Sequence, residues 1–75
     1  MTNICNIFTR RLGNTRNGNP RFEVMAYPVD GSSVIIGNTK GDSQFAYSMP
    51  VSGCAEVTWH KTPTGRVIIT NVTRA

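Results

Sequence analysis

The chain has 75 residues, of which 39% are hydrophobic and 16% are charged, and its formal net charge is +4. A chain of this length forms a single domain (residues 1–75), and its composition excludes a long disordered tract and a transmembrane helix of about 20 apolar residues. The excess positive charge lies ahead of the first acid, Glu23, and consists of four arginines: Arg10, Arg11, Arg16 and Arg21.

The first predicted strand covers residues 3–12, which are rich in apolar side chains. These side chains change face midway along the segment, so the strand needs a bulge or a strong twist there. The loop that follows, residues 13–20, contains the pair Asn17-Gly18, which tolerates positive φ, and Pro20 forces an extended exit. We therefore expect a hairpin with a loop longer than two residues and with Arg16 near its tip.

The second predicted strand covers residues 21–29 and alternates with the period of a half-buried strand. Val24 lies on the inward face of this strand, whereas Tyr27 lies on the outward face together with Arg21. Pro28 has no backbone N–H to donate to a ladder, so the strand should end there or lie at an edge.

Turns rich in glycine and proline separate four further predicted strands, at residues 33–39, 44–49, 54–61 and 66–72. No helix is expected, because the best candidate, residues 43–49, lacks helical apolar spacing and precedes a proline, so the segment should be a strand or irregular. The turn at residues 62–65 should join the last two strands into a hairpin. The large aromatic side chains expected in the core are Phe8, Phe22 and Trp59.

These elements predict an all-β fold of five to six short strands in one small domain. A meander of this kind would leave exposed edges if it were flat, and closure into a small antiparallel barrel removes most of them. An OB-fold is one form that such a barrel could take. A compact sandwich of two sheets is the alternative.

Catalytic and metal-binding chemistry is not expected. His60 is the only near-neutral base, no catalytic motif accompanies it, and the acids are scattered, so we predict no enzyme activity, no catalytic residues and no cofactor. Cys5 and Cys54 lie far apart outside any ligand cluster, which argues against a metal site and favours two reduced thiols. The first twelve residues contain no continuous apolar region, so we expect a cytoplasmic protein without a membrane partner.

A basic hairpin beside a β-surface favours a non-enzymatic module that binds the nucleic-acid backbone. In this hypothesis Arg10, Arg11, Arg16 and Arg21 converge to contact phosphates, and Tyr27 stacks on an unpaired base. The alternative is a protein-binding or structural module that acts through an edge strand or through residues 13–20, and a homodimer could form through such an edge. One stripe of arginines would indicate a polyanion, whereas arginines scattered around an apolar patch would indicate a protein.

Two stretches of the chain resemble small uncharacterised all-β proteins of actinobacterial phages. The resemblance lies in residues 12–14 and 17–22, the second of which has the sequence NGNPRF, and in the closing residues 65–68, GRVI. It implies a small phage accessory protein made in a bacterial cytoplasm, whose partner could be a host protein. The resemblance supplies no functional residues.

Overall fold

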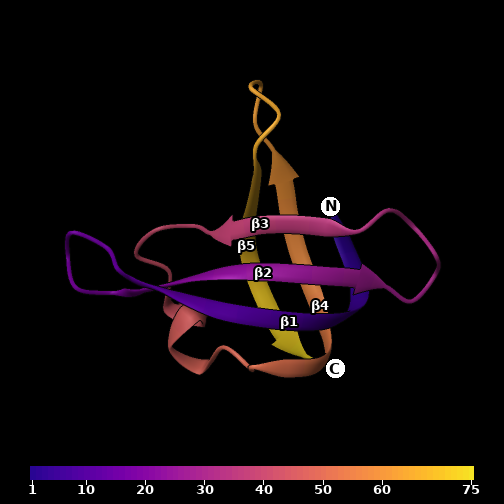
Figure 1. Ribbon diagram of the computed structural model, residues 1–75, viewed down its shortest axis with the longest axis horizontal. Coiled ribbons are helices and arrows are strands. Elements are labelled where there is room, and N and C mark those ends of the chain that lie inside the picture. The colour runs from indigo at the N-terminus through magenta and orange to yellow at the C-terminus, as the bar shows by residue number, and fades with distance from the viewer.

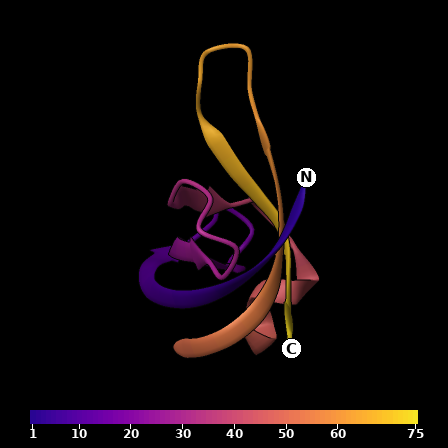
Figure 2. The ribbon, with the colours of Figure 1, turned by 90° about the vertical axis from the view of Figure 1, so that its right-hand side faces the viewer.

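Five β-strands and one short 3-10 helix follow one another along the chain in the computed structural model, which describes residues 1–75. The elements are β1 (Thr2–Asn14), β2 (Pro20–Pro28), β3 (Ile35–Thr39), η1 (Gln44–Ser48), β4 (Ser52–Lys61) and β5 (Val67–Arg74). In Figure 1, β1, β2 and β3 cross in front of β4 and β5, and Figure 2 shows the same two layers from the side. The predicted all-β class is confirmed.

The strands close into a barrel in the order β1-β2-β3-β5-β4, and β4 pairs again with β1. All neighbouring pairs are antiparallel except β3 and β5, which run parallel where Asn38 faces Ile68 and Thr39 faces Ile69. This order is that of the OB-fold, a five-stranded Greek-key barrel. The predicted barrel is present, but the connections are not a simple meander, because β4 pairs with β1 and β5 and not with β3.

The prediction of a strand at residues 44–49 is wrong, because the segment forms η1. Asp42 turns the chain with a positive φ of 59°, and the helix then places Ala46 in the interior. Phe45 and Met49, four residues apart, both pack against the core. This spacing suits one turn of helix and not an alternating strand, so the segment crosses one end of the barrel between β3 and β4.

The long strand β1 serves two partners, pairing with β4 through residues 2–8 and with β2 through residues 5–14. Its register shifts against β2 between Arg11 and Gly13, so the predicted irregularity exists but lies beyond the middle of the strand. Before that point the alternation is regular, with Cys5 and Ile7 fully buried. The expectation that Phe8 belongs to the core is therefore wrong, and its side chain is 53% exposed on the outer face.

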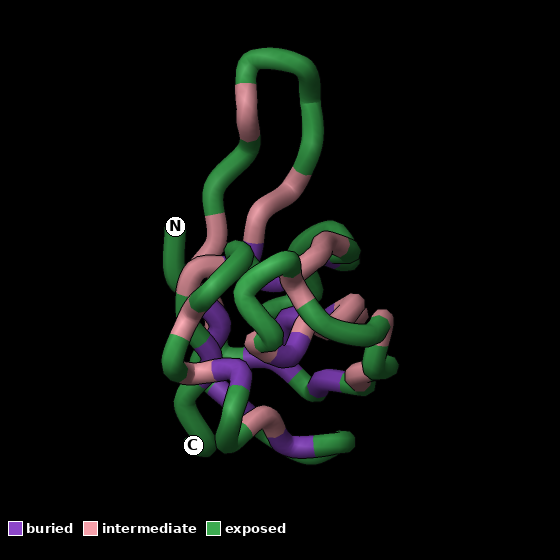
Figure 3. Tube along the Cα trace, turned by 90° about the vertical axis from the view of Figure 1, so that its left-hand side faces the viewer, coloured by how far each residue is buried: buried purple, intermediate pink, exposed green.

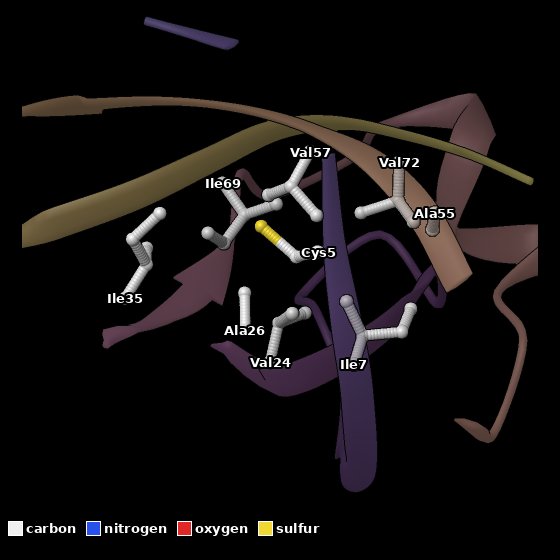
Figure 4. Close-up of a cluster of buried hydrophobic side chains, with 9 residues drawn as sticks. All are labelled: Cys5, Ile7, Val24, Ala26, Ile35, Ala55, Val57, Ile69 and Val72. Atoms are coloured by element: carbon white, nitrogen blue, oxygen red, sulfur yellow. The ribbon is translucent and has the colours of Figure 1, made fainter. Parts of the chain in front are cut away.

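The core lies between the two layers of strands and contains only small and medium side chains (Figure 4). Its members are Cys5, Ile7, Val24, Ala26, Ile35, Ala55, Val57, Ile69 and Val72. Figure 3 shows that these buried positions follow the body of the barrel. Of the other aromatics expected here, Trp59 packs against this cluster while partly exposed, whereas Phe22 is half-buried outside it. Phe22 falls outside because β1 and β2 extend past the barrel at that register, where Phe22 faces Arg11.

The predicted hairpin at the C-terminal end is confirmed, and it extends beyond the barrel. Its turn is closed by two backbone hydrogen bonds, from the Thr62 N–H to the Arg66 carbonyl at 2.8 Å and from the Gly65 N–H to the Thr62 carbonyl at 2.9 Å. We call residues 59–69 the β4–β5 ribbon; its base, at Trp59 and Ile69, packs in the barrel, and its turn projects beyond it. It rises above β3 and leans toward the β1–β2–β3 side of the molecule (Figure 2).

Candidate functional site

The outer face of β1, β2 and β3 carries large apolar side chains that point away from the core. The strand register places Phe8 opposite Met25 and Met25 opposite Ile36, which makes a row across all three strands. Tyr27 lies two residues farther along β2, on the same face. Phe8, Tyr27 and Ile36 are 53%, 42% and 55% exposed. We call Phe8, Met25, Tyr27 and Ile36 the outer patch. The face of the sheet that carries it is turned to the viewer in Figure 1.

Two aromatic rings of the outer patch hold each other in place. The rings of Phe8 and Tyr27 have centroids 6.1 Å apart and planes inclined by 82°, an edge-to-face contact. A shallow hollow opens beside them toward Ser52 and Gly53 of β4. Because the two rings are fixed and accessible, the patch offers planar surfaces on which another planar group can stack.

The four predicted arginines lie in one hairpin but not on one face. Arg10 shares the outer face with Phe8, and Arg21 shares it with Tyr27, about 20 Å away along β2 at the usual rise per residue. Arg11 follows Arg10 in the strand and therefore lies on the opposite face, where it donates to the Asn14 side chain. Arg16 is exposed in the loop at its tip. The four guanidinium groups thus surround the hairpin and do not form one stripe.

Carboxylates also lie among these arginines. Glu23 accepts a hydrogen bond from Arg10 at 3.2 Å, with the Arg10 side chain 69% exposed and that of Glu23 30% exposed. Asp42 lies against the β1–β2 loop, where it binds Thr15 and Asn19. These two carboxylates offset half of the positive charge of the four arginines, so the electrostatic attraction at this hairpin is weaker than the sequence indicates.

The β1–β2 loop is held in place by the side chain of Asp42. Its carboxylate accepts hydrogen bonds from the Thr15 hydroxyl at 2.6 Å, the Asn19 amide at 2.8 Å and the Asn17 amide at 3.0 Å. These three bonds, in the order Thr15, Asn19, Asn17, lower the pKa of the Asp42 carboxyl. The Tyr47 hydroxyl also donates to the Asn19 side chain. The loop is therefore attached to the segment before η1 through its side chains.

The β4–β5 ribbon brings one further cation, Arg66, near the outer face, which sequence reasoning missed. Lys61 and Arg66 flank the ribbon's turn, and both are exposed. Arg66 lines a hollow between the ribbon and β3, together with Ile36 of the outer patch and Glu23. The alternating pattern around Ile7 could have identified Phe8 as outward, but only the folded barrel shows that Arg66 lies near Ile36.

The structure shows no group of metal-ligating side chains and no membrane-spanning helix. His60 is exposed on β4, and no three His, Cys, Asp or Glu side chains lie close enough together to hold a metal ion. The chain contains no helix that is long and apolar enough to cross a membrane. Comparisons with protein-family models, curated proteins and solved structures found no match to this chain.

Proposed function

We propose that the protein binds single-stranded nucleic acid across the outer face of β1, β2 and β3. The observation that carries this proposal is the outer patch, in which the exposed rings of Phe8 and Tyr27 lie beside Met25 and Ile36. Arg10 shares the face of Phe8, and Arg66 lies beside Ile36. Stacking of a base on an aromatic side chain contributes about 1–3 kcal/mol and tolerates any base. A double helix cannot use these rings, since its bases are already stacked.

The barrel topology supports the same face. OB-fold proteins bind oligonucleotides or oligosaccharides on strands 2 and 3 and with the loops β1–β2 and β4–β5. In this chain those two loops carry Arg16 on one side and Lys61 and Arg66 on the other. This support is an analogy of fold, and the chemistry of the proposal comes from the outer patch itself.

Phosphate contacts should contribute less to the binding affinity than the number of arginines alone predicts. Arg10 is paired with Glu23 and Arg11 points to the other face, which leaves Arg16, Arg21 and Arg66 as the arginines nearest to a strand on the outer face. Each phosphate contact to a single strand adds about 0.7 to the slope of log affinity against log salt. We therefore expect a slope of about 2 from these three side chains.

The rival function is capture of a protein, and the exposed apolar surface is what favours it. The two surfaces that the sequence suggested for protein binding, an edge strand and residues 13–20, are less available in the structure. The closed strand order leaves little free edge for main-chain pairing, and the loop side chains of Thr15, Asn17 and Asn19 already bind Asp42. Bases need only the rings and the cations, so nucleic acid remains the proposed ligand.

The proposal is tested by fluorescence anisotropy with a labelled oligothymidylate of about 15 nucleotides, a length that spans one OB-fold. Replacing Phe8 and Tyr27 by alanine should weaken binding by about tenfold for each ring. Val51→Ala, which trims an exposed side chain outside the outer patch, is the matched control and should bind as wild type. Absence of binding at low salt, or equal affinity of the Phe8→Ala, Tyr27→Ala variant, would overturn the proposal. A pull-down from bacterial lysate that yields one dominant protein after nuclease treatment would favour the rival.

A further inference from the structure

A second concave site lies on the other side of the β4–β5 ribbon from Arg66. It encloses about 310 Å³ between the ribbon and the β2–β3 connection. Trp59, Lys61 and Val67 line it from the ribbon, and Ser32, Ser33 and Val34 line it from the connection. None of these residues belongs to the outer patch. The volume is at the small end of the range for ligand pockets, about 300–1,000 Å³, so it suits one small ring system.

The indole of Trp59 is a fixed wall of this pocket. The ring packs against the core cluster, and its N–H donates to the Asn3 side-chain oxygen at 3.0 Å. The Trp59 backbone N–H donates to the Met1 carbonyl at 2.9 Å, which ties β4 to the start of the chain. Because its only polar group is already bonded, the ring offers carbon surface to whatever enters the pocket.

The charge of the pocket wall favours an anionic ligand with a planar part. Lys61 is exposed at the wall, and no aspartate or glutamate lines the pocket. The pocket also reaches Ile35, whose side chain lies on the opposite face of β3 from that of Ile36 in the outer patch. A strand bound on the outer face must therefore cross the edge of β3 to place one base in the pocket while its phosphate stays near Lys61.

We propose that this pocket takes one unpaired nucleobase of the bound strand, stacked against Trp59, with an adjacent phosphate held by Lys61. This inference rests on the proposed function and adds a subsite to it. Stacking against an aromatic ring and an ion pair with a lysine need no base-specific hydrogen bond, so the subsite accepts different bases. Ser32 and Ser33 add two hydroxyl-bearing side chains to the pocket wall.

The test uses the fact that Trp59 is the only tryptophan in the chain, so intrinsic fluorescence reports on this pocket. A labelled oligothymidylate and an abasic strand of the same length are titrated into the protein, with binding followed by anisotropy and the pocket by indole emission. We expect the oligothymidylate to quench Trp59 in proportion to binding. The abasic strand should leave the Trp59 emission unchanged, even where the anisotropy shows that it binds.

Two variants and one control complete the test. Ser33→Phe fills the pocket from an exposed loop position, and it should weaken oligothymidylate binding by about tenfold, the contribution of one stacked base, and remove the quenching. Lys61→Gln should weaken binding by about threefold, while Lys40→Gln, which removes the same charge at the end of β3, should bind with an affinity close to that of the wild type.

The outcomes separate this inference from the proposed function. Binding by anisotropy without a change in Trp59 emission, or wild-type affinity of Ser33→Phe, would overturn the pocket and leave the outer patch as the binding face. Absence of any anisotropy change would overturn both. If Lys40→Gln weakened binding as much as Lys61→Gln does, the effect would be one of overall charge, and the role of Lys61 in the subsite would be rejected.

Discussion

Gly37 of β3 lies directly against Val67 of β5, so closely that a methyl group on Gly37 would come within 2.6 Å of the Val67 carbonyl oxygen and 2.7 Å of its Cγ1. This approach occurs where β3 and β5 begin the parallel contact that closes the barrel. It also sets the base of the β4–β5 ribbon over β3, between the outer patch and the Trp59 pocket. One small residue thus determines how the two candidate surfaces are joined.

Gly37→Ala should lower the free energy of unfolding by about 1–3 kcal/mol, because the backbone of Val67 has to move to make room. Urea denaturation measures the effect. Gly41→Ala is the matched control, since a methyl group there would meet only the side-chain methyl of Thr15 at 3.8 Å, an ordinary contact. Equal stability of the two variants would show that the close approach does not limit closure of the barrel.

The pair formed by Arg10 and Glu23 predicts that removing an acid improves binding. Glu23→Gln should raise the affinity for an oligothymidylate by about threefold and steepen the salt slope by about 0.7, because Arg10 becomes free for one more phosphate. Stability should change by less than about 1 kcal/mol, as is usual for an exposed ion pair.

The control for this change is Glu56→Gln on the outer face of β4, which removes the same charge from an exposed position away from β2 and β3. It should leave the salt slope unchanged. An equal gain in affinity for both variants would assign the effect to net charge and not to release of Arg10.

The carboxylate of Asp42 makes the β1–β2 loop sensitive to acid. Hydrogen bonds from Thr15, Asn19 and Asn17 lower its pKa below the ordinary value of 3.8. A group with a lowered pKa stabilises the fold fully above its unfolded-state pKa, and that stabilisation is lost as the pH falls through the folded-state pKa. The loop should therefore stay attached at neutral pH and loosen below pH 3.8.

The measurement is an NMR titration of the carboxyl carbons in the wild type and in Thr15→Val. The substitution removes the first of the three donors, so the Asp42 pKa should rise toward 3.8. Asp30 is the internal control, because its pKa is lowered by Ser32 and should not move. An Asp42 pKa that is the same in both proteins would contradict the role of the Thr15 hydroxyl.

The two cysteines should react at very different rates. Asn6 faces Cys54 and Cys5 faces Ala55 across β1 and β4, so the thiols lie on adjacent strands but on opposite faces, and both are free. Burial, with smaller contributions from Asp30 and Cys54, raises the pKa of the Cys5 thiol. A thiol reagent should modify Cys54 at once and Cys5 only at the rate of unfolding.

Mass spectrometry of the partly modified protein checks this prediction, and Cys54→Ser provides the control in which the fast phase is missing. Fast modification of both thiols in the folded protein would mean that the β1–β4 contact opens readily. A fast phase that persists in Cys54→Ser would contradict the burial of Cys5.

Local chemistry in the sequence was enough to locate most strands and turns. Pro28 ends β2 because it lacks a donor, Gly18 adopts a φ of 84° in the predicted loop, and residues 62–65 form the predicted turn. The inward positions of β4, Ala55 and Val57, also follow from strict alternation. These features depend on residues that are close in the chain, and so their signals can be recognised without the fold.

The features that matter most for binding were decided by contacts between distant segments. The sequence by itself determined an all-β domain with an arginine-rich hairpin, and it identified Tyr27 as an outward residue. Only the tertiary structure placed Phe8 beside Tyr27, paired Arg10 with Glu23 and formed η1 where a strand was expected. The physical reason is that the first two contacts depend on the register of β1 against β2, and η1 depends on the packing of Phe45 and Met49 against the core. No pattern of apolar residues within one segment encodes either choice.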